Sequence, residues 1–399
     1  CLAYSQQRAA KQIQTLQAVA ALDDPQVAYY LMRWSCNASR VNYLARATPQ
    51  RHCFAALQQF DAAVRDAFYA SAGFTLHPLA WEQVTMPTKQ DGLGLRSAAS
   101  VADAAYIGSR LATRERCQDI WQGSSWDAAT PGSDLAVALQ RCNGALQAAG
   151  LPSRLTAAPD KSLTQTSISS LLVLAQQAEW QGRAGSDDLC RVNAHSVDGA
   201  DTVLALVPSH TLDTSLSRDD FLTVVGGRLG VDVCAGTGGC RFCGRAMDAK
   251  GRHPSSCMAG GDTVLLHNAV RDLLHDYCHR AQVRPQLEAP GLLQGRRRPA
   301  DILVQSASAL VPRLPDGSVR AGLQALALDV AVVNALGEGH WDETRRTPGL
   351  ASSEYALLKR RRDNTDDLCR QAGVVYQPLV WEAQGGCTAE TRALVHRLA

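Results

Sequence analysis

The sequence predicts a mixed fold, in which a mainly helical N-terminal half precedes a small metal-binding knuckle and a C-terminal domain of the α/β class. Three observations support this order. Apolar residues recur at helical spacing before residue 230, three cysteines and one histidine gather between residues 240 and 257, and β-branched apolar runs of strand length follow residue 300. The 399 residues suffice for two or three domains with cores of their own.

We expect residues 1–125 to form a helical region. Two helices joined by a turn are predicted near residues 31–37 and 40–46, and a further helix from about residue 100 to 114. A stripe of four apolar side chains at helical spacing marks the buried face of another helix. The stripe consists of Leu57, Phe60, Val64 and Phe68.

Residues 126–230 are interpreted as a connector that contains helices. Gly, Pro, Ser and Ala dominate residues 126–160, a composition that predicts loose packing. The pair Ser217 and Asp220 resembles a capping box, which opens a helix that ends at Gly230. Two earlier helices are predicted at 136–149 and 167–180.

Residues 261–399 are expected to form the α/β domain, with the order helix, strand, strand, helix, strand. Its first helix is predicted over residues 262–282, with an amphipathic stripe of Leu266, Val270, Leu273 and Tyr277. The remaining elements are strands at 300–304, 325–333 and 374–381, and a helix at 353–372 that stops at Gly373.

The net charge of +2 excludes a strong overall basic field. From residue 231 onward, however, 21 Lys and Arg face 18 Asp and Glu, and 19 of those cations are Arg, which suits bidentate phosphate contacts. A GC-rich coding sequence is the alternative explanation. The 13 cysteines fit a reducing compartment with one metal site, so we expect an intracellular protein, nuclear or cytoplasmic.

Other bulk features bear on the setting of the chain. It has no run of 18 apolar residues, so we predict no membrane span. It starts at Cys1 without a signal sequence, which indicates a fragment of a longer polypeptide. Nothing in the sequence sets the oligomeric state.

Residues 231–260 contain the strongest short motif, with the spacing Cys-x2-Cys-x9-His-x3-Cys. Two thiolates two residues apart reach one ion from a tight turn, and the later pair completes a tetrahedron. Because four protein ligands leave no open position, we predict a structural zinc ion that largely drives the folding of this loop. Cys234 is an alternative ligand, and unrelated side chains in a loop are the other alternative. The motif consists of Cys240, Cys243, His253 and Cys257.

Two acids on predicted strands, Asp301 and Asp329, are candidate ligands for magnesium. Asp329 interrupts an otherwise apolar strand, and a buried strand rarely carries an ionised acid that is neither paired nor bound to metal. Hydrolysis of a phosphodiester needs a metal held by carboxylates, so the pair predicts nuclease chemistry. The alternative is an ion pair between Asp329 and one of Arg296, Arg297 or Arg298.

The cation of the predicted site is less well defined. Nucleases with two such carboxylates usually carry a lysine two residues after the second acid, and Ala331 occupies that position. The helix at 353–372 offers Lys359 or Arg362 as the replacement, because both lie on one side of it at about 100° per residue. The alternative is a solvated basic run, with Arg360 and Arg361, that contacts phosphates only.

Four further residues have two interpretations each. Glu288 and Glu382 are either additional metal-site acids or surface residues. His267 and Arg271 share a face of the helix at 262–282, where they either contact phosphate or cover the surface of the domain.

The order of several motifs carries a resemblance. These are residues 86–96, 102–106, Cys240 to Cys257, His267 to Asp272, Arg298-Pro-Ala-Asp301, Leu328-Asp329-Val-Ala-Val and Tyr376 to Glu382. In this order they resemble the C-terminal part of non-LTR retrotransposon polyproteins, namely the site-specific elements with a restriction-like endonuclease of the PD-(D/E)xK type. The resemblance covers most of the chain and is weak between residues 126 and 200.

The resemblance implies a domain order and an activity. Residues 1–125 would correspond to the thumb region after the reverse transcriptase palm, 231–260 to a CCHC knuckle and 261–399 to the endonuclease. Such proteins nick target DNA and extend its 3′ end on the element's RNA, so DNA and that RNA are the implied partners. No Tyr-x-Asp-Asp motif occurs, so this chain would not polymerise alone.

The resemblance also implies residue roles. Asp301 and Asp329 would hold magnesium, whereas the family's catalytic Lys and the Tyr three residues later correspond to Arg362 and Thr365, with Lys359 one turn earlier. The segment between the two acids, residues 305–323, is also long for the family. Contacts to nucleic acid are expected from Arg241, Arg245, Arg252, Arg360 and Arg361.

The sequence therefore favours a magnesium-dependent DNA endonuclease module. The main alternative is a catalytically decayed, nucleic-acid-binding remnant of the same family. A helical protein-interaction scaffold with a zinc site is a third class.

Overall fold

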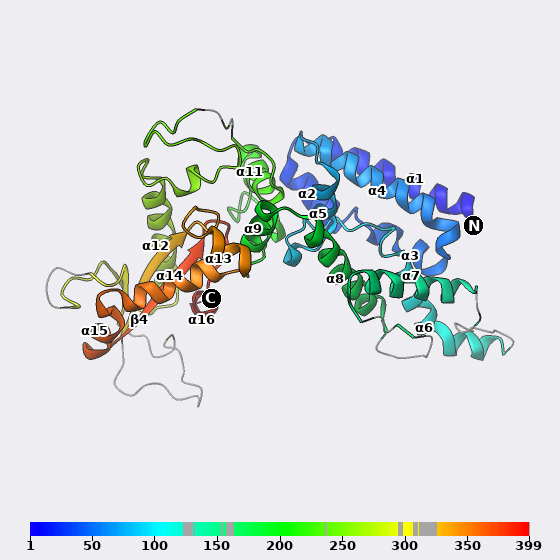
Figure 1. Ribbon diagram of the computed structural model, residues 1–399. Helices are drawn as coiled ribbons and strands as arrows, with labels where there is room; N and C mark the ends of the chain where they lie inside the picture. Colours follow the sequence, from blue (N-terminus) through cyan, green and yellow to red (C-terminus); the bar gives the residue numbers. More distant parts are fainter. Residues whose placement is uncertain are drawn as a thin grey trace. The chain divides into compact units, whose positions relative to one another are not determined.

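The computed structural model is mainly helical, with one four-stranded mixed sheet and one cluster of cysteine and histidine side chains (Figure 1). This confirms a mixed fold. The chain divides into two compact units, which are described separately below: unit 1 is 1–185 with 204–229, and unit 2 is 186–203 with 230–399. The structure describes residues 1–122, 130, 132–152, 155–156, 163–234, 236, 238–293, 298–305, 310 and 325–398.

Helix ends in unit 1 follow local sequence signals. Helix α2 (Pro25–Trp34) starts after Asp24, whose carboxylate accepts hydrogen bonds from two backbone N–H groups of the first turn at 2.9 and 3.0 Å. Helix α4 (Gln50–Ala72) ends at Gly73, where φ is +75°. The other elements are α1 (Leu2–Ala20), α3 (Ser39–Ala47), α5 (Pro78–Thr85), η1 (Thr88–Gln90), α6 (Ala102–Ile120), α7 (Asp134–Ala148), α8 (Gln165–Arg183) and α11 (Arg218–Leu229).

The helices predicted for the first 125 residues are present. The stripe on α4 is fully buried, since Leu57, Phe60, Val64 and Phe68 are each at most 3% exposed. The first of the two helices was misplaced: α2 spans Pro25–Trp34 rather than about 31–37, so the turn before α3 begins three residues earlier than predicted. Burial of this stripe is what fixes α4 in the core of unit 1.

The interpretation of residues 126–230 as a connector needs correction. Leu139 and Leu146 of α7 and Ile168 of α8 share a buried cluster with Ile107 of α6, so both helices belong to the core of unit 1. Residues 186–203 belong instead to unit 2. The composition suggested loops because the Gly- and Pro-rich stretches flank these helices; much of those stretches lies outside the described residues.

A buried ion pair joins α11 to the segment after η1. Arg228 and Asp91 are 1% and 0% exposed, and Nε of Arg228 lies 3.2 Å from Oδ1 of Asp91. The guanidinium also donates to the carbonyl of Thr88 at 2.7 Å. The side-chain amide of Gln83 donates to the carbonyl of Asp91 at 2.9 Å. This network ties three segments together in the interior of unit 1.

Unit 2 contains the sheet, in the order β1-β2-β3-β4. Strand β2 pairs antiparallel with both β1 and β3. Strands β3 and β4 are parallel and are joined by a helical crossover. The elements are α9 (Ser186–His195), α10 (Thr202–Ala205, where the chain returns to unit 1), η2 (Pro254–Ser256), α12 (Asp262–Arg280), β1 (Pro285–Leu287), β2 (Ile302–Val304), β3 (Ala325–Val333), α13 (Trp341–Arg346), α14 (Leu350–Arg361), η3 (Arg362–Asn364), α15 (Thr365–Gln371), β4 (Val374–Glu382) and α16 (Ala389–Leu398).

Helices cover both faces of this sheet. On one face, Leu274 and Cys278 of α12 and Leu394 of α16 pack against the apolar side chains of β2, β3 and β4. On the other face, α14 lies along β4 (Figure 1), and its Ala356 packs against Val333. The two faces explain why the strands are apolar runs without strict alternation.

The predicted stripe on α12 is correct at Val270, which packs against the core of the sheet, and wrong at its other three positions. Leu266, Leu273 and Tyr277 are 46%, 54% and 39% exposed, whereas Leu274 and Cys278 are 3% and 0% exposed. The buried face therefore runs through Val270, Leu274 and Cys278, rotated from the predicted one. The sequence offers apolar residues on both faces of this helix, and only contact with the sheet selects one of them.

The single helix predicted over 353–372 is also wrong, because it is three elements. Asp363 and Asn364 have left-handed φ values of +51° and +57°, which end α14 and start α15 in a new direction. Side chains before and after this break therefore share no face. The short edge strand β1 had not been predicted, since three residues are too few to show a period. No helix in the described part of the chain combines the length and apolar character that crossing a bilayer requires.

Replacing Arg228 by Ala is expected to lower the free energy of unfolding by about 3–5 kcal/mol, because the Asp91 carboxylate stays buried without its cation. Urea unfolding followed by circular dichroism measures the change. The control is Arg8→Ala, at an exposed position on α1, which should change the value by less than about 0.5 kcal/mol. Equal effects of the two variants would contradict a structural role for the buried pair.

Candidate functional site

The four side chains of the predicted knuckle come together. The ligand atoms of Cys240, Cys243, His253 and Cys257 all lie within 4.8 Å of one another. Sγ of Cys240 is 3.8 Å from Sγ of Cys257, and Sγ of Cys243 is 3.3 Å from Nε2 of His253. Three thiolates and one imidazole form a donor set that can hold a metal ion such as zinc. Cys234 lies outside this group.

Backbone hydrogen bonds shape the loop that presents these ligands. The N–H of Cys240 donates to the carbonyl of Arg245 at 2.7 Å, and the N–H of Gly244, at φ +73°, donates back to the carbonyl of Cys240 at 2.8 Å. Backbone N–H groups of Phe242 and Cys243, together with His253, lower the pKa of Cys240 to about 6. The thiolate is therefore the dominant form at neutral pH, as metal binding requires.

A second turn holds the histidine half of the cluster. The carboxylate of Asp248 accepts the backbone N–H groups of Arg252 and His253 at 2.9 and 2.7 Å. These bonds fix the backbone turn from which His253 reaches the other three ligands.

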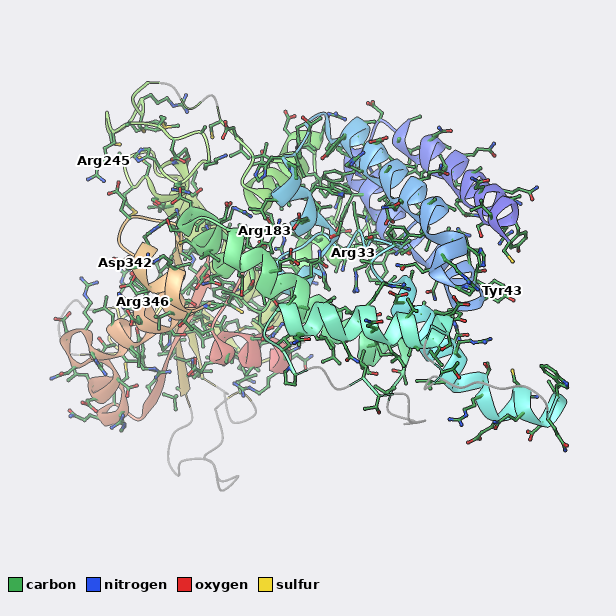
Figure 2. The ribbon with its side chains drawn as sticks, turned by 45° about the vertical axis from the view of Figure 1, so that its right-hand side comes forward. Arg33, Tyr43, Arg183, Arg245, Asp342 and Arg346 are labelled. Atoms are coloured by element: carbon green, nitrogen blue, oxygen red, sulfur yellow. The ribbon has the colours of Figure 1, made fainter. Side chains whose placement is uncertain are left out.

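The knuckle arginines have different surroundings. Arg241 lies over the ring of Phe242, 4.6 Å from its centroid, and both side chains are exposed. Arg245 projects from the knuckle into solvent (Figure 2). Arg252 instead pairs with Asp187 at 3.1 Å and stacks on Trp341 at 4.4 Å. Two of the three predicted contact residues are thus open to a ligand, whereas Arg252 is engaged within unit 2.

Asp301 lies directly before β2, beside the middle of β3. Its backbone N–H donates to the carbonyl of Leu328 at 2.9 Å, and its Oδ2 accepts the N–H of Val330 at 2.7 Å. Nε2 of His267, from α12, is 3.4 Å from the same oxygen. Burial raises the pKa of Asp301, and the neighbouring Asp329 carboxylate raises it further, against the opposing effect of the Val330 N–H.

Asp329 occupies the fifth position of β3, and two donors hold its carboxylate. Nζ of Lys359, from α14, donates to Oδ1 at 2.7 Å and also to the carbonyl of Val330 at 3.3 Å. The phenol of Tyr376, from β4, donates to Oδ2. Burial, and then the Asp329 charge, raise the pKa of Tyr376, so the phenol stays protonated and acts as a donor.

The structure thus brings Asp301, Asp329 and Lys359 together and leaves Arg362 apart. Arg362 is exposed at the break after α14, and its carbonyl accepts a hydrogen bond from the hydroxyl of Thr365. Because the helix does not continue through residues 362–364, the predicted alignment of Arg362 with the acids fails. Lys359 is the cation that reaches Asp329.

The remaining basic residues of α14 differ from one another. Arg360 is half-buried and donates to the carbonyl of Tyr376 at 3.1 Å, with Asp366 at 3.4 Å. This guanidinium braces β4 rather than facing solvent. Arg361 is exposed, as a phosphate contact requires.

The two further acids are not ligands beside Asp301 and Asp329. Glu382 is buried on β4, four residues after Pro378, which is the register partner of Asp329. It therefore lies about 13 Å along the strand from that partner. Its Oε1 accepts the hydroxyl of Ser352 at 2.8 Å, and burial raises its pKa. Glu288 is exposed and bridges Arg271 and Arg298. Arg298 therefore pairs with Glu288, not Asp329; Arg296 and Arg297 lie outside the described residues, as do most of residues 305–323.

Tyr376 is the site residue that sequence reasoning missed. Its register partner on β3 is Ala327, two residues before Asp329. A tyrosine in an apolar strand is ordinary core material, and only the parallel pairing of β3 with β4 brings its hydroxyl to an acid.

Comparison of the chain with models of known protein families and with curated protein sequences gave no match. The resemblance stated above consequently rests on the order of the motifs in this chain.

Protein prepared in the presence of zinc is expected to retain about one ion per chain. Cys243→Ser should lose it, because a hydroxyl is a far poorer zinc ligand than a thiolate. Mass spectrometry of the metal content measures the loss, and hydrogen exchange should show faster exchange across residues 238–258.

The matched control is Cys234→Ser, in the same segment but outside the cluster, which should retain the ion. A Cys234→Ser variant that loses zinc while Cys243→Ser retains it would show that the ligand set is different.

Proposed function

We propose that unit 2 is a magnesium-dependent DNA endonuclease of the PD-(D/E)xK type. In this proposal it is the nicking module of a non-LTR retrotransposon protein, which acts in target-primed reverse transcription. The observation that carries the proposal is the placement of two acids, Asp329 within β3 and Asp301 directly before β2, beside one ammonium group. Asp329 is 2.7 Å from Lys359, and Asp301 is bonded to the residue that follows Asp329.

The donor set is compatible with a magnesium ion. Mg²⁺ is usually bound through one or two carboxylates, with water and substrate phosphate completing the octahedron. Among the described residues, the contacts of the Asp301 carboxylate fall on Oδ2, and the side chain is 22% exposed. Bound magnesium would lower the pKa of a water molecule and offset charge on the phosphate. Asp301 and Asp329 are the residues that would hold it.

Lys359 lies where a cation could assist this reaction, beside the Asp329 carboxylate. Its side chain is only 18% exposed, so its charge acts in a partly desolvated setting where electrostatic effects are stronger than in water. In the proposed reaction it orients the attacking water or offsets charge that develops on the phosphate. Tyr376 fixes the orientation of Asp329 from the opposite side, which limits the rearrangement needed when substrate arrives.

The knuckle would serve as a nucleic-acid contact next to the cutting domain. A zinc ion held by Cys240, Cys243, His253 and Cys257 would brace the loop that exposes Arg241 and Arg245. Arg361 supplies a further exposed cation on α14. In a retroelement protein these residues would contact target DNA and element RNA in the nucleus or cytoplasm.

A second function, a nucleic-acid-binding protein without nuclease activity, is favoured by one observation. Both oxygens of Asp329 already accept a hydrogen bond, from Lys359 and from Tyr376. An ion would have to share these oxygens with strong donors, which weakens its binding relative to a free carboxylate. The two functions differ in whether DNA is cut.

Lys359→Met is expected to reduce the rate of nicking of supercoiled plasmid in Mg²⁺ by about 100-fold, because one charge-stabilising group is lost. Arg362→Met should reduce it by less than about threefold, since only a surface phosphate contact is removed. Gel electrophoresis of the nicked form measures both rates. Similar losses in the two variants would contradict the assignment of Lys359.

Asp329→Asn tests the acid directly. It should abolish nicking while DNA affinity, measured by fluorescence anisotropy, stays within about threefold of wild type. Plasmid that remains supercoiled with the wild-type protein, despite salt-dependent binding, would instead support the non-cutting function.

A further inference from the structure

An ionic network lies at the edge of the carboxylate pair. Glu288 bridges two arginines from different elements: Oε1 is 3.2 Å from Arg271 of α12, and Oε2 is 2.6 Å from Arg298. Arg271 also pairs with its neighbour Asp272 at 2.8 Å. Two guanidinium groups therefore converge on one carboxylate from opposite sides.

The network is joined to Asp301 through three links. The N–H of Glu288 donates to the carbonyl of Asp301 at 2.8 Å. Arg298 precedes Asp301 by three residues. Arg271 lies one turn of α12 after His267, whose ring is 3.4 Å from the Asp301 carboxylate. If a nucleic-acid strand lies across the two acids, a phosphate next to the one at the acids would lie near the two arginines.

Glu288 is held in an unfavourable backbone conformation. Its φ is +46°, in the left-handed region that residues with a side chain rarely adopt. The antiparallel pairing of β1 with β2 ends just before it. The bond to Asp301 and the two arginine contacts maintain this conformation, and they aim the carboxylate between the guanidinium groups.

The energetics favour exchange of this carboxylate for a stronger ligand. The side chains of Glu288 and Arg298 are 48% and 58% exposed, and ion pairs so exposed contribute little to stability. Arg271 is 16% exposed and already positioned. A phosphodiester carries the same single negative charge as the carboxylate, with two free oxygens that fit the fork of a guanidinium group.

We propose that Arg271 and Arg298 form a subsite for a DNA backbone phosphate next to the scissile one, and that Glu288 fills this subsite in the free protein. The subsite deepens the proposed endonuclease function and rests on it for the identity of the ligand. DNA binding displaces the Glu288 carboxylate from between the two guanidinium groups. Glu288 thereby weakens binding of nucleic acid that does not reach the carboxylate pair.

The test is the affinity for a DNA duplex, measured by fluorescence anisotropy without added divalent ion, over a range of salt concentrations. Arg298→Gln should weaken binding by about threefold to tenfold and lower the slope of log affinity against log salt by about 1. Glu288→Gln should strengthen binding by about threefold, because the arginines lose their internal competitor. Arg271→Gln should act like Arg298→Gln, provided that circular dichroism shows it to be folded.

The matched control is the ion pair between Arg280 and Asp276, which is exposed on the same helix with an N–O distance of 2.8 Å. Asp276→Asn changes the net charge as Glu288→Gln does. If Asp276→Asn strengthens DNA binding as much as Glu288→Gln does, the gain comes from the change in net charge alone, and the subsite is overturned. Unchanged or weaker DNA binding by folded Glu288→Gln would also overturn it.

Two further outcomes separate this inference from the proposed function. If the wild-type protein nicks plasmid while Arg298→Gln and Glu288→Gln both bind DNA with wild-type affinity, the subsite is overturned and the nuclease proposal stands. If the protein does not nick, but Arg298→Gln weakens DNA binding and Glu288→Gln strengthens it, the subsite stands and the nuclease proposal is overturned. Shifts seen only with single-stranded RNA, and not with duplex DNA, overturn DNA as the ligand.

Discussion

The chemistry proposed for this protein depends on one electrostatic constraint, the placement of two acids, Asp301 and Asp329, as neighbours across β2 and β3. Burial and mutual repulsion make such a pair unfavourable, as the raised pKa of Asp301 shows. The fold offsets this cost with three donors: Lys359 and Tyr376 on Asp329, and the Val330 N–H on Asp301. The helices α12 and α14 and the strand β4 are arranged so that these donors, together with His267, meet the acids.

Asp329 and the Cys/His cluster could be predicted from the sequence because each is marked by residues that lie close together along the chain. An acid inside an apolar strand, as at Asp329, is rare enough to stand out, and the spacing of Cys240, Cys243, His253 and Cys257 is typical of loops that can hold a metal ion. The strands β3 and β4 were predictable because most of their nine residues are apolar and many are β-branched.

The parts that sequence reasoning missed are those set by tertiary contact. Helical periodicity made Lys359 and Arg362 equally plausible, and only the left-handed turn at Asp363 and Asn364 separates them. On α12 both faces carry apolar residues, so the sheet decides which is buried. Tyr376 is the sharpest case, because the distance between it and Asp329 along the chain is 47 residues. Nothing local distinguishes a tyrosine that packs in a core from one that also holds an acid.

Several charged groups around the acids are paired with an opposite charge of the protein itself. Lys359 pairs with Asp329, and Glu288 pairs with Arg271 and Arg298. Such pairing offsets part of the cost of burying charge at this edge of the sheet. It also sets the affinity of any ligand, because each one competes with an internal partner. In the proposed nuclease, magnesium would compete with Lys359 for Asp329, and a DNA phosphate would compete with Glu288 for the two arginines.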